Sequence, residues 1–502
     1  MTELVHVSAI ANQTGMPLSR VMAFHADRDP DALCLTVGER SIARRAFDEL
    51  SNGVALTYQR LGVQPGDLVT IALPNSIELC LAIFAAWKCG AVPHMMSYRM
   101  PPHEAQDLVD LVDPPVVVGG PEGLRARSRL TDADIAAVTP RKEGLPEAHV
   151  SPHWKAISSG GSTGRPKVIV AHKVANFDPM APVMGQRIDG TALIPGPLYN
   201  NGPFMGAMLT MVIGCHVILT GKFDPEETLR LLDRHKVDWA FFVPTMMGRM
   251  AKLPDEVRAR YDLSHLNMVL HSASMCPVWV KQAWIDWIGP EKILEGYGGT
   301  EAQGLTFITG TEWLEHRGSV GRPMPGSKVL ILDSEGRELQ PGEVGEIFFL
   351  PDNPETKSYH YIGAERREVG AAGSVGDMGW LDEDGWLFIA DRRTDMIVSG
   401  GANIYPAEIE GALEAHPSIL SSLVIGLPDD DLIATVHALV QLDPAMPAVG
   451  PDEIKDWLKQ RIAVFKLPRS FEFVTESLRD DAGKARRSQI RDERIRATNP
   501  SP

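Results

Sequence analysis

Helix-like segments alternate with short β-branched runs through the first half of the chain, and this alternation limits the fold more than any other feature. Residues 47–61 and 77–88 have helical spacing, whereas residues 68–73 and 116–118 are typical of buried strands. The alternation continues in strands at 217–219 and 239–243 and in helices at 225–235 and 246–253. Such alternation is typical of βαβ units, so we predict an α/β fold built on parallel-rich sheets.

The pattern changes after about residue 325. Residues 328–332 and 345–350 predict strands joined by Gly- and Pro-containing turns, and another hairpin turns at 382–385. A compact α+β pattern then fills 406–474, with helices expected at 406–415 and 452–464 and strands at 423–425, 436–441 and 471–474. We therefore expect a large N-terminal domain, residues 1–393, that ends in a β-rich subdomain, and a small α+β C-terminal domain, residues 394–502. The charged tail from Arg491 to Pro502 predicts a frayed end.

Residues 158–167 place glycines, hydroxyls and a lysine between two strand-like runs. Glycine lets backbone N–H groups turn toward an anion, and hydroxyl and ammonium groups add donors, so this loop predicts phosphate binding. A Walker A motif needs Gly-Lys-Ser/Thr at the start of a helix. Here Pro166 separates Gly164 from Lys167 and a strand follows. The predicted phosphate ligands are Ser159, Gly160, Gly161, Ser162, Thr163, Gly164 and Lys167.

The residues of this loop fit two other interpretations. Residues 160–164 fit G-x-S-x-G, the nucleophile elbow of hydrolases, but an elbow must turn from strand into helix. This loop continues into a strand, which disfavours a hydrolase with Ser162 as nucleophile. The loop could also be a surface loop with no role, and the motifs described below argue against that.

Charge and composition exclude several classes of protein. A net charge of −16 argues against nucleic acid as a partner. No run approaches the roughly 20 apolar residues of a membrane span, and the first residues lack the layout of a signal peptide. The five cysteines are scattered without a C-x-x-C pair, so neither disulfides nor a zinc site is expected. We expect a cytoplasmic protein.

Four further motifs identify a family. They are Glu-Gly-Tyr-Gly-Gly-Thr-Glu at 295–301, Ser-Val-Gly-Asp-Met-Gly-Trp at 374–380, the run from 389 to 410, and Asp-Ala-Gly-Lys at 481–484. Together with the phosphate loop, they resemble the adenylate-forming superfamily of acyl-CoA synthetases, peptide-synthetase adenylation domains and luciferases, over nearly the whole chain. Residues 289–293, 312–313 and 318–323 look most like bacterial bile-acid and carnitine-type CoA ligases.

The resemblance implies a two-step reaction. A carboxylate attacks the α-phosphate of ATP, which gives acyl-AMP and pyrophosphate, and the thiol of coenzyme A then displaces AMP. ATP and Mg²⁺ are thus implied, with coenzyme A as co-substrate. The small domain is expected to rotate between the two steps. The resemblance favours a bulky, polycyclic or aromatic acid.

The resemblance also assigns the nucleotide site residue by residue. Ser159, Thr163 and Lys167 would hold the β- and γ-phosphates, and Thr300 would bind the α-phosphate. Glu301, with Thr163, would bind Mg²⁺, a hard cation that prefers oxygen ligands. The ribose and adenine would contact Asp377, Arg392, Tyr297, Gly298 and the small-residue segment Ser272, Ala273 and Ser274.

The implied catalytic residues are Lys484, Thr300 and Glu301. The Lys484 ammonium, between the incoming carboxylate and the α-phosphate, would neutralise charge that builds in the transition state. Thr394 aligns with the hinge between the domains. The acceptor channel would be lined by Gly400, Gly401, Ala402 and Asn403.

The acid pocket is expected along three segments rich in methionine and aromatic residues. Methionine adapts to irregular apolar shapes, although the same residues could be ordinary core. The expected pocket residues are Tyr199, Asn200, Asn201, Gly202, Phe204, Trp239, Phe242 and Met246.

The acceptor is left open by one departure. Many relatives have histidine where this chain has Asn200, so an amide synthetase that passes acyl-AMP to an amine is the first alternative. A non-catalytic nucleotide-binding scaffold is a remote one, since Lys484, Glu301 and Asp377 are all retained. Members of the superfamily are often dimers, which allows a homodimer.

Overall fold

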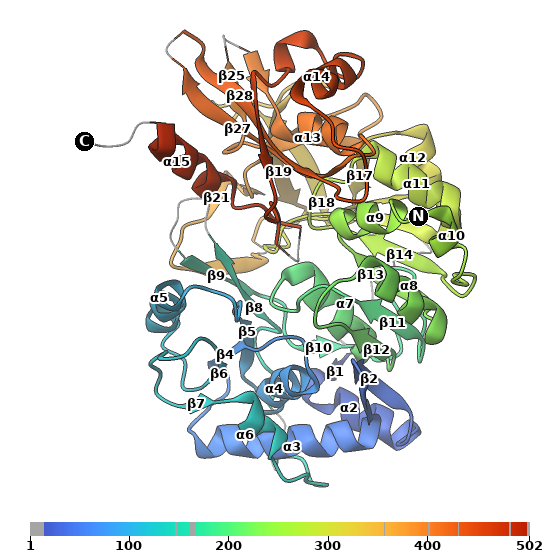
Figure 1. The fold of residues 1–502 in the computed structure, drawn as a ribbon. Helices are drawn as coiled ribbons and strands as arrows, with labels where there is room; N and C mark the ends of the chain where they lie inside the picture. The colour runs from blue at the N-terminus through green and yellow to red at the C-terminus, as the bar shows by residue number, and fades with distance from the viewer. Residues whose placement is uncertain are drawn as a thin grey trace.

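The computed structural model describes residues 15–145, 149–160, 166–355, 357–399, 402–429, 431–480 and 483–498. The blue and green N-terminal elements form the lower body in Figure 1, and the orange and red elements after residue 394 lie above them. No helix in these ranges is long and apolar enough to span a bilayer.

Two mixed sheets, each with a run of adjacent parallel strands as predicted, form the core of the N-terminal domain, and the second continues into the antiparallel strands of the β-rich subdomain. One has parallel strands β4 (Leu68–Ala72), β5 (Val92–Met95), β6 (Val117–Gly119), β7 (Arg129–Leu130) and β8 (Ala156–Gly160), with β9 (Pro166–Ala171) and β20 (Tyr359–Ile362) antiparallel at its edge. The other carries β2 (Leu33–Val37), β12 (His216–Leu219), β11 (Thr191–Ile194), β13 (Trp239–Phe242), β14 (Met268–His271) and β15 (Ile293–Tyr297) in parallel.

Helix α4 (Ile77–Lys88) joins the two sheets. All of its residues are buried, and it contacts β4 and β5 of one sheet and β2 of the other. A helix that is apolar around its whole circumference is stable only inside a core, which explains why this segment lacks a polar face. Flanking helices include α3 (Arg44–Arg60), α5 (Pro102–Val112), α7 (Asn201–Val212), α8 (Pro225–Arg234), α9 (Pro244–Ala251) and α11 (Val278–Ile288).

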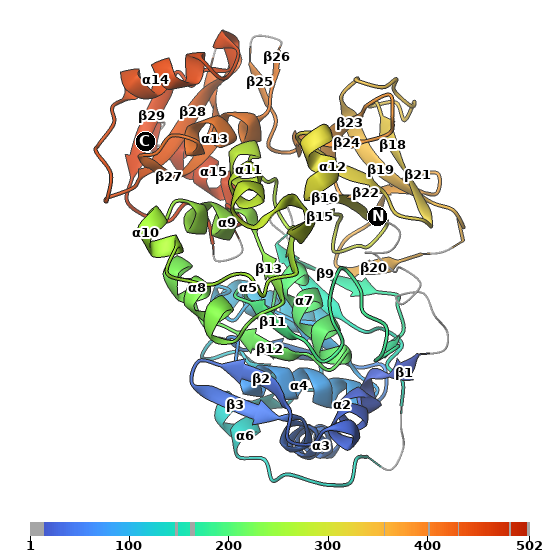
Figure 2. The same cartoon turned by 90° about the vertical axis from the view of Figure 1, so that its right-hand side faces the viewer.

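The chain after β15 turns antiparallel, which confirms the predicted β-rich subdomain. The strands are β16 (Thr306–Thr309), β17 (Ser319–Pro323), β18 (Ser327–Leu332), β19 (Gly345–Pro351), β21 (Arg367–Val369), β22 (Ala372–Ser374), β23 (Asp377–Leu381) and β24 (Leu387–Arg392). Figure 2 shows this part at the upper right and the small domain at the upper left.

The small domain has its own core. Helices α13 (Pro406–Glu414) and α14 (Pro451–Lys459) pack on the three strands β27 (Ile419–Asp429), β28 (Ile433–Leu442) and β29 (Ser470–Val474). The hairpin β25 (Ile397–Ser399) and β26 (Ala402–Ile404) precedes them. Because this core contains no residue before Ile397, we keep Thr394 as the proposed boundary.

Two expectations about the C-terminal region are wrong. The predicted helix 452–464 ends at Lys459, and a short 3₁₀ turn follows at η2 (Val464–Lys466). The tail is not frayed from Arg491, because α15 (Arg487–Thr498) continues to Thr498, and residues 499–502 lie outside the described part of the chain. Ile490 packs on a small apolar cluster of β27 and β28, and Arg494 forms an ion pair with Glu472, so the helix is held by contacts that lie far away in sequence.

Candidate active site

Strands β8 and β9 form an antiparallel hairpin, which confirms the strand–loop–strand prediction for the phosphate loop. Ser159 pairs with Lys167, and Gly160 pairs with Pro166. These four predicted or neighbouring residues therefore lie at the base of the loop. Gly161, Ser162, Thr163 and Gly164 lie outside the described residues.

Lys167 and Glu301 lie close together at the loop end of that hairpin. The Lys167 Nζ atom lies 3.8 Å from Glu301 Oε1 and 4.0 Å from the centre of the Tyr361 ring. Burial lowers the pKa of Lys167, and the Glu301 charge opposes that shift. A cation and a carboxylate thus lie beside the predicted phosphate loop.

Tyr361 is a site residue that sequence reasoning missed. Its hydroxyl donates to Glu301 Oε1 at 2.6 Å, and it lies on β20, next to β9. The neighbouring Ser358 hydroxyl donates to the Glu301 carbonyl oxygen at 2.8 Å. The alternating Tyr359-His360-Tyr361 run was a signal for a strand, but its pairing with β9 bridges nearly 200 positions and no local pattern specifies it.

Two glycines shape the turn that carries Thr300 and Glu301. A Cβ atom on Gly299 would lie 2.7 Å from both Glu301 Oε2 and Val375 Cγ1, and one on Gly298 would lie 2.5 Å from a Leu305 methyl. Only glycine fits at such distances, so the pair lets the Glu301 carboxylate fold back against the turn. Its side chain is largely buried.

Tyr297, Asp377 and Arg392 form a second cluster, on β15, β23 and β24. The Tyr297 hydroxyl donates to Asp377 Oδ2 at 2.8 Å, and Arg392 Nε lies 3.7 Å from Asp377 Oδ1. Burial raises the pKa of Asp377, while Arg392 and the Tyr297 hydrogen bond act against it. The structure thus brings together three of the residues predicted to hold ribose and adenine, from segments nearly 100 positions apart.

The segment 272–274 follows β14 in an unusual conformation. Ala273 has a φ of 79°, a left-handed value that costs a residue with a Cβ about 1 kcal/mol or more. The Ser274 Oγ atom is buried and has no hydrogen-bond partner among the described residues. Backbone strain of this kind gathers at ligand-binding loops, which agrees with the predicted adenine segment.

The predicted acid-pocket residues divide into two groups. Phe204, Trp239 and Phe242 are fully buried and belong to the main core. The Phe204 ring packs on Trp154 and the Phe242 ring on Trp284. Trp239 Nε1 donates to the Met184 carbonyl. The second group, at the start of α7 and α9, is Tyr199, Asn200, Asn201, Gly202 and Met246. Of these all but Met246 are partly exposed.

A cavity of about 450 Å³ lies in the β-rich part, where Ala302, next to Glu301, is one of its lining residues. Its walls include Gln303, Lys357, Arg366 and Glu368, and Arg366 forms an ion pair with Glu368 at 2.8 Å. None of the predicted acid-pocket residues lines it. We therefore keep the acid site at the start of α7.

Lys484 of the small domain reaches the same region. A Cβ on Gly483 would lie 2.7 Å from Thr245 Oγ1 of α9, so the Lys484 segment touches the large domain directly. Protein atoms around the ammonium lower the pKa of Lys484, and Arg392 lowers it further, whereas Asp480 and Glu301 oppose the shift. Lys484 is thus in electrostatic contact with both clusters of the N-terminal domain.

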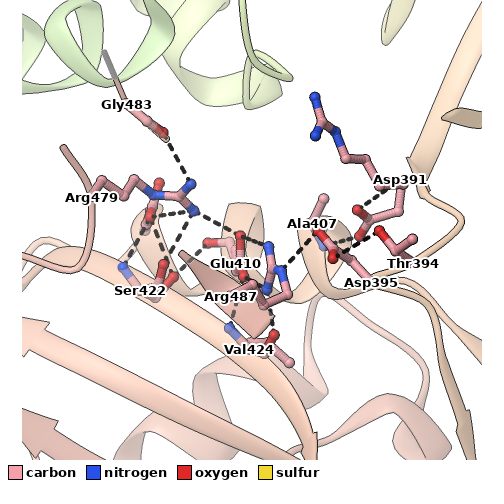
Figure 3. A network of polar contacts seen from close by, with 12 residues as sticks. Asp391, Thr394, Asp395, Ala407, Glu410, Ser422, Val424, Arg479, Gly483 and Arg487 are labelled. Atoms are coloured by element: carbon pink, nitrogen blue, oxygen red, sulfur yellow. Dashed lines mark hydrogen bonds and ion pairs between the residues drawn. The ribbon is translucent and has the colours of Figure 1, made fainter. Parts of the chain in front are cut away.

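The segment that carries Lys484 is fixed at both ends by one carboxylate. Arg479 Nη2 lies 2.7 Å and Arg487 Nη1 lies 2.5 Å from the buried Glu410 side chain of α13. Figure 3 shows both guanidinium groups turned toward Glu410. Arg479 also donates to the Gly483 carbonyl at 3.4 Å, and Arg487 lies 3.1 Å from Asp395 beside the proposed hinge. Burial alone would raise the pKa of Glu410, but the two arginines bring it down to about 2.

We expect Glu410→Gln to destabilise the small domain by about 3–5 kcal/mol at neutral pH, because two buried guanidinium groups lose their counter-charge. Scanning calorimetry of the full chain would measure the shift of that domain's transition. Since the pKa of Glu410 is depressed, its contribution is present above about pH 4.5 and is lost as pH falls toward 2. Glu408→Gln, which removes an exposed partner of Lys466, is the matched control and should cost at most about 1 kcal/mol. Equal losses would contradict the anchoring role of Glu410.

The proposed hinge residue lies at the proposed domain boundary, and the described residues of the proposed acceptor channel lie in the small domain. Thr394 is exposed in a turn after β24, and its hydroxyl donates to Asp395 at 3.3 Å. Ala402 and Asn403 begin β26, whereas Gly400 and Gly401 lie outside the described residues. Their hinge and channel roles remain predictions.

Comparisons with known proteins agree with this geometry. A model of the AMP-binding enzyme family matches residues 22–350, and a model of the AMP-binding enzyme C-terminal domain matches residues 408–484. A 2-succinylbenzoate–CoA ligase of Bacillus licheniformis is 28% identical over 484 residues, which cover 93% of this chain and 98% of that protein.

Two solved structures share the fold. The anthranilate CoA ligase AuaEII, in complex with anthranoyl-AMP, matches with a TM-score of 0.82 at 22% identity and covers 98% of this chain and 99% of its own. The amide bond synthetase McbA from Marinactinospora thermotolerans matches with a TM-score of 0.78 at 24% identity, covering 95% and 99%. With both family models placed in order along the chain, the protein belongs to the family of AMP-binding, adenylate-forming enzymes.

Proposed function

We propose that the protein activates a bulky, aromatic or polycyclic carboxylic acid with ATP, forming acyl-AMP and pyrophosphate, and then transfers the acyl group to coenzyme A. One observation carries this proposal. The segment of the small domain that carries Lys484 docks on Thr245 of the large domain, and the Lys484 ammonium feels the charges of Glu301 and Arg392, which belong to the predicted phosphate and ribose sites. The 2-succinylbenzoate–CoA ligase relative, whose named acid is aromatic, supports the substrate class and the thiol acceptor.

The residues fit a magnesium ion that is held mainly by substrate. No group of three or more His, Cys, Asp or Glu side chains among the described residues is placed to hold a metal by itself. Mg²⁺ at a nucleotide site commonly uses one or two carboxylates together with phosphate oxygens, and Glu301 supplies such a carboxylate. The bound ion would neutralise phosphate charge, while Lys167 and Lys484 place further positive charge around it.

An amine acceptor is the second candidate, and Asn200 favours it. The resemblance places a histidine at this position in many thiol-using relatives, near the carboxylate and the thiol path. Asn200 directly precedes α7 and has a buried Nδ2 atom with no partner among the described residues. An amide side chain lacks the proton-accepting nitrogen of imidazole, so the thiol step would proceed here without a base at this position.

A pyrophosphate-release screen tests the proposal. Benzoate, cinnamate, 2-naphthoate and cholate are each supplied with ATP, with and without Mg²⁺, in the presence of coenzyme A, of simple amines, or of neither. Mass spectrometry identifies the products. An acyl-CoA product supports the ligase, whereas an amide formed without coenzyme A would replace it by the amide synthetase. If none of the acids gave Mg²⁺-dependent release of pyrophosphate, the proposed adenylation would be wrong.

Asp377→Ala should raise the KM for ATP by about 10- to 100-fold, because a charged acceptor of two ribose hydroxyls is lost at about 1.5–3 kcal/mol. The KM for the acid should change little. Steady-state kinetics at varied ATP measures the effect. Tyr297→Phe is the matched control, since it removes only the hydroxyl that donates to Asp377. Unchanged ATP dependence of the Asp377 variant would count against ribose binding.

A further inference from the structure

Lys155 is a buried lysine that the activation chemistry described above does not use. It directly precedes β8, the strand that leads into the phosphate loop, and is 2% exposed. Its Nζ atom donates to the Asn201 side-chain oxygen and lies 5.1 Å from the centre of the Trp154 ring. No carboxylate in the described ranges is within ion-pair distance of it. The protein therefore holds a cation in its interior against one neutral amide and one ring.

This arrangement works against stability. An ion without a counter-charge in the interior costs several kcal/mol, and a lysine that served only packing could be replaced by an apolar residue of the same length. Burial lowers the pKa of Lys155 to about 7, and Glu301 is the charged group that acts to raise it. The side chain therefore changes charge within the physiological range, being an ammonium below about pH 7 and an amine above.

The contact with Asn201 places Lys155 beneath the proposed acid site. Asn201 is the first residue of α7, and no side chain caps the start of this helix. In the same turn Pro203 packs over Gly196, which also faces a methyl of Met246 on α9. The neighbouring Thr245 is in contact with Gly483 of the lysine-bearing segment. The first turn of α7 thus contacts Lys155 directly and is linked through Gly196 and α9 to the segment that carries Lys484.

We propose that Lys155 is a positioning residue of the acid site: through Asn201 it fixes the first turn of α7, and its ammonium makes the floor of that site positive for the acid's carboxylate. This inference rests on the proposed function and adds to it how the acid is held. The charged form is the one that attracts the carboxylate, so acid affinity should fall as pH rises through about 7. A bound carboxylate should in turn raise the pKa of Lys155, so that binding at pH 7.5 takes up a proton.

Calorimetry on the full chain tests this directly. The probe is 2-naphthoate, bound with a non-hydrolysable ATP analogue in buffers of different ionisation enthalpy, and the uncharged match is 2-naphthamide. We expect uptake of a substantial fraction of a proton with 2-naphthoate and none with 2-naphthamide. Lys155→Met, which has the same length without charge, should abolish the uptake. It should also raise the KM for the acid tenfold or more at pH 6.5, with the KM for ATP unchanged.

Two variants separate this role from simple packing. Asn201→Asp gives Lys155 a counter-charge, so the fall in acid affinity should move to higher pH. Lys173→Met is the matched control, since Lys173 is a half-buried lysine at the end of the same hairpin whose ammonium faces the Phe177 ring. It should leave acid KM and proton uptake as in wild type. If Lys155→Met does not fold, the wild-type proton uptake and the Asn201→Asp shift still decide.

The outcomes distinguish this inference from the proposed function. Wild-type adenylation without proton uptake, or with the same pH profile in Asn201→Asp, would overturn the role of Lys155 and leave the function intact. Absence of 2-naphthoate binding to wild type would overturn the aromatic-acid site and this inference with it.

Discussion

Replacing Lys484 by alanine should reduce acyl-AMP formation by about 10²- to 10³-fold, because the role proposed for its ammonium is to neutralise charge that develops only in the transition state. Transfer from pre-made acyl-AMP should be largely spared, since that step no longer needs charge neutralised between a carboxylate and a triphosphate. ATP–pyrophosphate exchange measures the first step, and release of AMP from supplied acyl-AMP measures the second.

The control for Lys484→Ala is Lys459→Ala in the same domain. Lys459 is exposed on α14 and pairs with Asp456 of the same helix, so its loss should leave both steps unchanged. Equal loss of both steps in Lys484→Ala would contradict its assigned role and would indicate that the small domain no longer docks. Gly483 contacts Thr245 of the large domain, so a variant whose small domain no longer docks should lose both steps together.

Replacing Glu301 by glutamine should reduce pyrophosphate release by about 10²-fold or more, because metal-ion stabilisation of a phosphoryl transition state is worth several kcal/mol. The variant keeps the shape of the side chain and removes its charge. The Mg²⁺ concentration that gives half-maximal activity should rise steeply. Titration of Mg²⁺ at fixed ATP measures both effects.

Tyr361→Phe is the matched control for Glu301→Gln. It removes the hydroxyl that donates to Glu301 and keeps both the carboxylate and the ring beside Lys167. We expect a much smaller loss and an unchanged requirement for Mg²⁺. Should the two variants behave alike, Glu301 would serve to hold β20 against the turn, and a metal role for it would be wrong.

Much of the fold was readable from local pattern. Helix α4 begins and ends at the predicted residues, because a continuous apolar run bounded by Ser76 and Gly90 leaves few alternatives. The hairpin of β8 and β9 followed from glycines between β-branched runs. By contrast, α14 ends five residues early. Helix α15 forms where a frayed tail was expected, because Ile490 packs on the distant strands β27 and β28.

The motifs predicted the nucleotide-binding residues, and the structure shows which segments bring them close together. Lys167, Glu301 and Tyr361 meet because β9, the turn after β15, and β20 converge, and only two of these three segments carried a motif. The anchoring of Arg479 and Arg487 on Glu410 had no sequence signal at all, since arginine near a charged tail is ordinarily solvated.

The sequence by itself determined most of the elements and the two-domain plan and predicted which residues bind nucleotide, because periodicity, glycine placement and motif order are local properties. Only the tertiary structure decided which partners those residues have. It placed a tyrosine on Glu301, one carboxylate behind the Lys484 segment, and a buried ammonium under α7. Each of these pairs joins positions far apart in the chain, and such pairing depends on how sheets and domains pack, which no short stretch of residues encodes.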